Sequence, residues 1–215
     1  MRLSLILAAV LAAAMPLAVV PAGAQVAAAG AANPGDPAAP VFVEKLANDA
    51  FAVLRDKSLS KAASRAKFRT MLQQNVALAD IGNRLIRRQR AAITPAQYTA
   101  YQAALPDFVL NAYADRLYDY SDATVKTIRT IGRGPMTDVY TRVTRPNAQP
   151  IDAIWQVKPT TGGKSMINNL SVSGINLSLT QEADFNAYIQ KNGFDALVAF
   201  LKSANGKSAA ARTAS

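Results

Sequence analysis

The sequence predicts an α+β fold, in which a curved antiparallel sheet of about four strands packs against a mainly helical lobe. Three observations predict it. Residues 40–121 repeat apolar side chains at helical spacing. Residues 122–179 change to a period of two and are rich in Val, Ile, Thr and Tyr. Residues 180–204 return to the helical period. A run of helices followed by a run of strands is typical of helices packed on one face of an antiparallel sheet.

The first 24 residues are typical of a signal peptide. Arg2 precedes a long apolar run, and Ala22-Gly23-Ala24 fits the small-x-small pattern of a cleavage site near Ala24. A membrane span is the alternative, but Pro16 and Pro21 interrupt it. We therefore expect an exported protein. Residues 25–39 and 205–215 are rich in Ala and small polar residues, which predicts a flexible lead-in and a flexible tail around a folded domain of residues 40–204.

The helical part begins with an apolar stripe that runs from Val43 to Leu54. Residues 61–90 contain few helix breakers and predict a further helical stretch. Thr94 and Pro95 then fit the N-cap and the first position of another helix, which Pro106 should kink or split.

The strands follow from alternating β-branched residues between turn-forming residues. We expect strands at 124–133, 136–145, 151–158 and 164–179. Thr180 should cap the final helical region, which Gly193 should break into two helices.

Composition excludes most catalytic chemistry. The 215 residues include no His and no Cys, so there is no His general base, no thiol nucleophile and no imidazole or thiolate metal site. Nucleotide-binding and esterase motifs are also absent. We expect no catalytic residue, no metal site and no cofactor, and a protein that binds rather than transforms its ligand.

The chain is basic, with 24 Lys and Arg against 14 Asp and Glu. A dense basic cluster comprises Arg84, Arg87, Arg88 and Arg90. A solvated helix face is one interpretation. A docking surface for anionic head groups or an acidic protein is the other. Export argues against a nucleic-acid partner.

The apolar stripes and strands predict a large hydrophobic interior, which is either a filled core or the wall of a cavity; periodicity alone does not separate the two. If a cavity exists, these residues are our candidates for lining it: Phe51, Leu54, Tyr101, Leu105, Phe108, Tyr113, Leu117, Val139, Val143, Trp155, Val157, Leu170, Val172, Phe185 and Ile189.

An ordered set of motifs spans most of the predicted domain: Asp80–Leu85, Thr94–Tyr101, Asn111–Tyr120, Leu170–Leu177, Asp184-Phe185 and Ile189–Leu197. This set resembles the MlaC family, including its hopanoid-associated HpnM-like branch. The sequence departs from the family where Ser165–Leu170 replaces a usual Trp-Lys-Val-x-Asp-Val run and Ser173 precedes Gly174.

This resemblance implies a periplasmic phospholipid carrier with an NTF2-like curved sheet joined to a helical lobe. Acyl tails would enter between the two, while head groups stay outside. The implied partners are an inner-membrane ABC transporter complex and an outer-membrane lipoprotein complex, and we expect a monomer. Other interpretations stay open: a carrier of hopanoid, polyisoprenoid, quinone or hydrophobic toxin, an enzyme using Tyr, Lys or Asp on the same scaffold, or a structural adaptor with a filled core.

Overall fold

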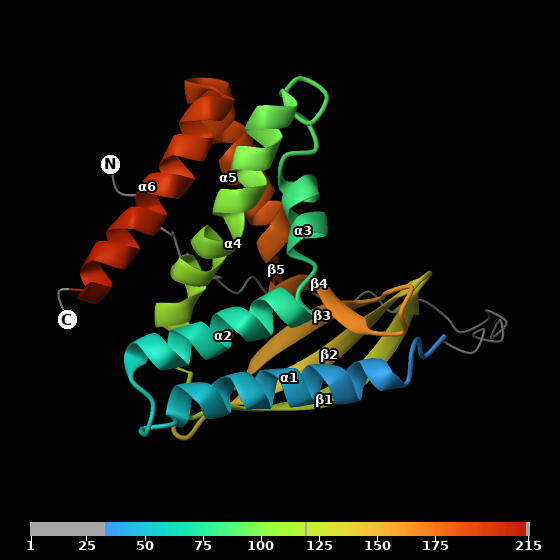
Figure 1. Cartoon of the computed structure of the whole chain (residues 1–215). Coiled ribbons are helices and arrows are strands. Elements are labelled where there is room, and N and C mark those ends of the chain that lie inside the picture. Colours follow the sequence, from blue (N-terminus) through green and yellow to red (C-terminus); the bar gives the residue numbers. More distant parts are fainter. Residues whose placement is uncertain (1–32, 119, 214–215) are drawn as a thin grey trace, which may run out of the picture. The chain divides into compact units, whose positions relative to one another are not determined.

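The computed structural model describes residues 33–118 and 120–213, all within one compact unit, Ala32–Ser215 (Figure 1). The predicted signal peptide and residues 25–32 of the predicted lead-in lie outside the described residues, as does the aspartate at position 119. None of the described helices is both long and apolar enough to span a membrane. The elements in chain order are α1 (Ala38–Arg55), α2 (Lys61–Asn75), α3 (Leu78–Leu85), α4 (Pro95–Tyr118), β1 (Thr124–Arg133), β2 (Met136–Thr144), β3 (Ile151–Pro159), β4 (Ser165–Val172), β5 (Ile175–Asn176), α5 (Leu177–Asn192) and α6 (Phe194–Thr213).

The sheet is antiparallel throughout, with its five strands in sequence order from β1 to β5. This confirms the predicted α+β fold. The expected single strand over 164–179 is wrong, because the chain reverses at Ser173 and Gly174, whose φ values of 49° and 80° form a tight hairpin turn. Helix α5 then begins at Leu177, three residues before the expected cap at Thr180. Its cap is Asn176, whose side chain accepts from the backbone N–H of Leu179.

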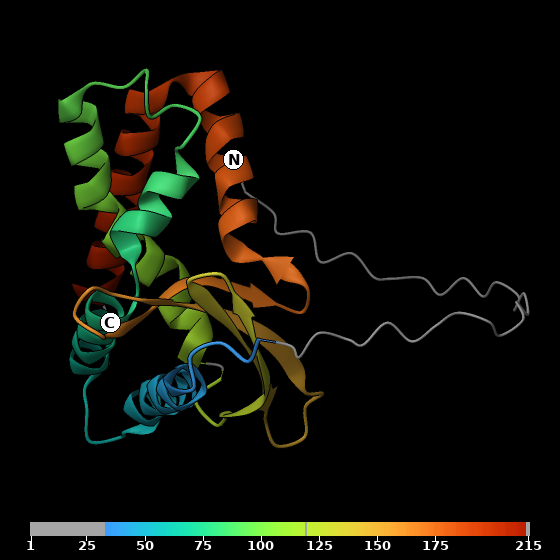
Figure 2. The same ribbon diagram turned by 90° about the vertical axis from the view of Figure 1, so that its right-hand side faces the viewer.

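Helix α1 lies against one face of the sheet, which we call the inner face (Figure 2). Val139 of β2 and Val157 of β3 are buried there against Ala39 and Val43 of α1. Neighbouring residues on the same strands, such as Tyr140 and Ile154, point to the opposite side because side chains alternate along a strand. We call that side the outer face. None of the clusters of buried hydrophobic residues among the described residues includes Tyr140 or Ile154.

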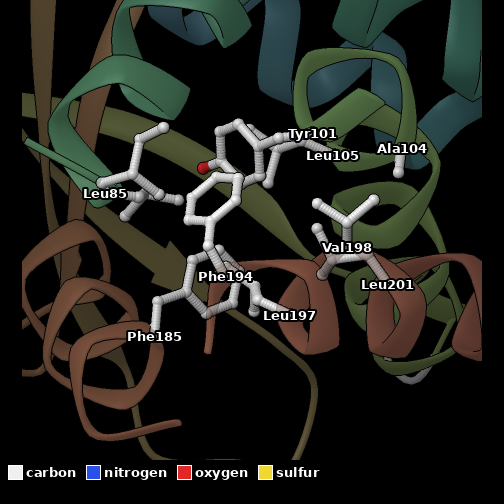
Figure 3. Close-up of a cluster of buried hydrophobic side chains, with 10 residues drawn as sticks. Leu85, Tyr101, Ala104, Leu105, Phe185, Phe194, Leu197, Val198 and Leu201 are labelled. Carbon is white, nitrogen blue, oxygen red and sulfur yellow. The ribbon is translucent and has the colours of Figure 1, made fainter. Parts of the chain in front are cut away.

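A second layer consists of α3, α4, α5 and α6 around a core of their own (Figure 3). Tyr101 and Leu105 of α4, Phe185 of α5 and Leu197 of α6 are almost completely buried in it. The Tyr101 ring packs edge-on to Phe185, with 6.4 Å between ring centroids. Pro106 lies inside α4, which continues through it as one helix.

The expected helical stretch 61–90 is interrupted. Helix α2 ends at Asn75, where Val76 pairs with Ile167 and the N–H of Ala77 donates to the Ile167 carbonyl. After α3, residues 86–92 form turns, so the arginines beyond Arg84 lie on a loop and not on a helix face. The helix breaks here because the backbone of residues 76 and 77 pairs with Ile167 of β4. The local sequence pattern does not indicate this long-range contact.

Gly193, at φ 85°, separates α5 from α6 as predicted. The expected flexible tail from residue 205 is wrong, because α6 continues to Thr213. Two hydrogen bonds from α4 explain the continuation. The side chain of Asn205 donates to the Ala104 carbonyl and accepts from the side chain of Asn111. This anchoring holds the helix across Gly206, and the alanines that follow favour helix.

Candidate functional site

The inner face of the sheet carries a row of apolar side chains that the helices bury only partly. Trp155 of β3 lies opposite Leu170 of β4, and Val172 of β4 lies opposite Ile175 of β5. Trp155, Leu170 and Val172 are half-buried, and Ile175 is 50% exposed. We call these four residues the inner strip. Three of the four are half-buried and the one at the β5 edge is exposed, so the strip reaches solvent at that edge.

The inner strip is positioned by local sequence. Val, Ile and Trp favour strands, and the Ser173–Gly174 turn returns Ile175 to the face that Val172 occupies. The first half of β4 lies under the α2–α3 junction through Ile167, whereas Leu170 and Val172 lie three and five residues beyond it. This places the second half of β4 outside that contact.

Trp155 is the only tryptophan of the chain and lies where two hydrophobic clusters meet. Its indole N–H donates to the Thr141 hydroxyl at 2.8 Å. On one side it packs with Val139 and Val157, and on the other with Phe51 and Val125. The hydrogen bond satisfies the polar atom of the indole, so the rest of the ring presents apolar surface.

The described candidate lining residues fall into two groups, which belong to separate hydrophobic clusters. In the helical layer, Tyr101, Leu105 and Phe185 are closed in a packed cluster with Phe108 and Ile189 partly buried at its edge. The sheet group comprises Phe51, Leu54, Val139, Val143, Trp155, Val157, Leu170 and Val172. The side chains of Tyr113 and Leu117 lie outside the described ones.

Sequence reasoning missed two exposed apolar residues: Ile175 of the inner strip, which is 50% exposed, and Leu179 of α5, which is 55% exposed. Both lie within the stretch that was read as one long strand. Because Ile175 pairs with Val172, it places exposed apolar surface at the β5 end of the strip. The signal in the sequence is a shift of the apolar–polar alternation by one residue at Ser173-Gly174, between Val172 and Ile175, which indicates a turn there.

The four arginines of the basic cluster all have partners within the chain. Arg84 is half-buried and donates through Nη2 to the backbone carbonyl of Asn168, which ties α3 to β4. Burial lowers the pKa of Arg84, opposed by the carboxylates of Asp80 and Glu182. Arg87 donates to the buried Glu182 at 2.7 Å, and Arg88 lies 3.9 Å from the same oxygen. Arg90 lies over the Tyr98 ring.

The polar groups of the helical layer are also occupied. The Tyr101 hydroxyl donates to the Gly82 carbonyl, and burial raises the pKa of Tyr101 well above its usual value. The described residues contain no cluster of three or more acidic side chains that could hold a metal ion. The inner strip itself carries only apolar side chains beside the hydroxyl of Thr141, so its chemistry suits an apolar ligand and offers no acid or base pair.

Two hollows lie away from the inner strip. One, of about 360 Å³, lies between α4 and α6 and is lined by Ala96, Ala100, Val198 and Lys202 among others. The other, of about 370 Å³, lies on the outer face and is lined by residues that include Ile128, Arg129, Tyr140 and Ile154. Neither is lined by the inner strip.

Comparison with known proteins gives a family and a fold. A family model described as MlaC protein matches residues 44–203. A solved structure of a phospholipid-binding protein from Ralstonia solanacearum, in complex with a phospholipid, matches with a TM-score of 0.68. That protein is 21% identical in sequence, and the match covers 80% of this chain and 98% of the other. At this identity the likeness establishes the shared fold.

Proposed function

The chain belongs to the MlaC family, and on that premise we propose that it is a periplasmic lipid carrier that receives phospholipid acyl tails at the inner face of its sheet. The observation that carries the proposal is the inner strip. Its four apolar residues lie on the inner face of the sheet, where Trp155 is half-buried and Ile175 is exposed to solvent. The Ralstonia protein, whose structure contains a phospholipid, supports the choice of ligand.

The energetics favour a carrier over free transfer. Moving one methylene from water to an apolar site is worth about 0.8 kcal/mol, so two acyl chains with on the order of 30 methylenes cost on the order of 20 kcal/mol to expose to water. A membrane already buries those chains. The protein therefore needs only to match the apolarity of the bilayer for exchange to be nearly neutral, and it needs no catalytic group.

For tails to enter, the helical layer must part from the inner strip. Two polar contacts link α3 to the sheet. Arg84 bonds to the Asn168 carbonyl, and Lys158 of β3 pairs with Asp80 of α3 at 2.6 Å. The exposed Lys158–Asp80 ion pair contributes little to stability, whereas the half-buried Arg84 bond contributes more. We propose that these contacts give way when a lipid enters, while the cores of the two layers stay packed.

Delivery in this proposal takes place at an inner-membrane ABC transporter complex and an outer-membrane lipoprotein complex. The loop arginines Arg88 and Arg90 are exposed and make only long-range or stacking contacts within the chain. Arg84 and Arg87 donate short hydrogen bonds within the chain instead, so we assign docking to Arg88 and Arg90. Reversing both charges should slow delivery to such complexes without emptying the lipid site. Unchanged delivery would refute this assignment.

The direct test of lipid carriage is mass spectrometry of lipid extracted from the protein after purification without detergent. We expect a stoichiometric phospholipid. A bound hopanoid or another terpenoid would mean that the protein is a carrier of a different lipid class. A protein that stays empty after incubation with liposomes would refute the proposal in favour of an adaptor with a filled core.

A matched pair of variants locates the site. Ile175 and Ile128 are 50% and 52% exposed on the same sheet, but Ile175 lies at the inner strip and Ile128 lines the hollow on the outer face. Ile175→Asp should lower the amount of bound lipid severalfold, whereas Ile128→Asp should leave it unchanged. Equal losses in the two variants would argue against the inner strip.

A further inference from the structure

We propose that the outer face of the sheet is a docking surface for an anionic phospholipid bilayer. The proposal concerns contact with the membrane surface itself and does not depend on what the inner strip binds. It rests on three features of one region: an exposed isoleucine beside two half-buried apolar side chains, cations that lack ion-pair partners among the described residues, and sheet edges that are already occupied.

The apolar feature is centred on Ile128. The register of β1 with β2 shifts between Thr127 and Arg129, so Ile128 lies at a bulge, where its side chain is 52% exposed. Tyr140 and Ile154 lie opposite each other on β2 and β3 and line the same hollow of about 370 Å³. An aliphatic side chain beside a tyrosine is suited to the boundary between head groups and acyl chains.

The charge feature is a positive excess on the same face. Arg129 stacks over the Tyr140 ring at 4.1 Å and makes no ion pair in the described part of the chain. Lys126, also exposed on β1, likewise makes none among these residues. Arg142 forms two hydrogen bonds with Asp152, and Arg133 pairs with Asp138, so these two acidic groups are already balanced. The unbalanced charge is therefore positive and would attract anionic phosphates.

The third feature excludes a partner that adds a strand to the sheet. At the β1 edge, the Asn48 side chain donates to the Val125 carbonyl and accepts from the Val125 N–H, and Glu44 accepts from the N–H of Thr127. At the opposite edge, β5 has two residues and leads directly into α5. Contact must therefore use the face and not the edge. A bilayer offers apolar chains and phosphates at adjoining depths, which matches an exposed isoleucine beside an unpaired arginine.

The test is co-flotation of the full chain with phosphatidylcholine vesicles that contain or lack phosphatidylglycerol. We expect binding only with phosphatidylglycerol, and weaker binding as salt rises. Arg129→Glu should weaken it at least about fivefold. The matched control is Lys57→Glu, which makes the same charge change at an exposed residue between α1 and α2, and it should retain most of the binding. Equal losses of vesicle binding in the two variants would mean that only the net charge of the protein attracts it to the vesicles, and would overturn the proposal.

The isoleucine pair separates this proposal from lipid carriage. Ile128→Asp should weaken vesicle binding and keep the bound lipid, and Ile175→Asp should do the reverse. Absence of vesicle binding in the unmodified protein would overturn the bilayer proposal alone, because bound lipid is measured separately. A dimer that Arg129→Glu dissociates, in a protein that ignores vesicles, would assign the face to a second copy of the chain and would also overturn it.

Discussion

The indole N–H of Trp155 donates a hydrogen bond to the hydroxyl of Thr141 on the neighbouring strand, at 2.8 Å. Thr141 is completely buried, and its own hydroxyl is directed to the Ala153 carbonyl. The bond therefore fixes the largest side chain of the inner strip from beneath. A tryptophan whose polar atom is satisfied by the sheet can meet an acyl chain without leaving a buried donor unpaired.

Removing the acceptor should cost stability. Thr141→Val keeps the shape of the side chain and leaves the indole N–H without its partner. We expect a loss of about 1–3 kcal/mol in the free energy of unfolding, measured by urea denaturation. Trp155→Phe in the same background should recover part of that loss, because it removes the unpaired donor. A Thr141→Val protein as stable as the unmodified one would show that the bond is not formed in solution.

Helix α1 should depend on the paired bonds between Asn48 and Val125. Asn48→Ala removes both and leaves the backbone N–H and carbonyl of an edge strand without their partner. We expect the free energy of unfolding to fall by about 1–3 kcal/mol. Asn192→Ala is the control, because that exposed side chain only donates to the carbonyl of its own helix at Tyr188. Its effect should stay within about 0.5 kcal/mol.

The buried Tyr101 predicts a specific dependence of stability on alkaline pH. Burial raises the pKa of Tyr101 in the folded chain, whereas in the unfolded chain it ionises near pH 10. Its contribution is therefore complete below about pH 10 and is lost as pH rises above that value. Tyr101→Phe should be less stable at neutral pH by about 1 kcal/mol, through the lost bond to Gly82.

Above pH 10 the difference between the two proteins should shrink, because phenylalanine does not ionise. Urea denaturation across neutral and alkaline pH measures this difference. A constant difference through pH 11 would contradict the burial of an un-ionised hydroxyl at this position.

Arg84 should be a structural residue and Arg88 a surface residue, although both belong to the basic cluster. Arg84→Ala removes the donor to the Asn168 carbonyl, and we expect a loss of about 1–3 kcal/mol in the free energy of unfolding. Arg88→Ala removes only a 3.9 Å ion pair of an exposed side chain, so the change should be below about 0.5 kcal/mol. Thermal or urea unfolding of the two variants under the same conditions measures both losses of stability. Equal effects would contradict the division of the cluster.

The sequence was sufficient for the fold class and for the first three strands, because period-two runs there end at Gly and Pro turns. It was insufficient from Leu170 to Leu179. The alternation of apolar and polar residues runs from Leu170 to Val172 and again from Ile175 to Leu179, and its phase shifts by one residue at Ser173-Gly174. The single-strand prediction overlooked that shift, which marks the turn. The second run also does not distinguish a short strand from the first turn of α5, so one strand was expected where a strand, a turn, a short strand and a helix occur.

Long-range contacts explain the other differences. The α2–α3 break depends on Ile167, which lies far along the chain from Val76. The extension of α6 depends on Asn205 meeting Ala104 and Asn111. The same limit applies to the site. Tyr101 and Leu170 are both apolar residues at the right period, but only tertiary packing places the first in a closed cluster and the second on a half-open face.

Quenching of Trp155 fluorescence by phospholipids brominated on their acyl chains tests the central claim most directly, because the chain has no other tryptophan. Bromine quenches only at close range, so the signal reports whether a tail reaches the inner strip. The account predicts strong quenching with brominated lipid, none with the same lipid unbrominated, and a large reduction in Ile175→Asp but not in Ile128→Asp. Stoichiometric lipid binding without any quenching of Trp155 would contradict it.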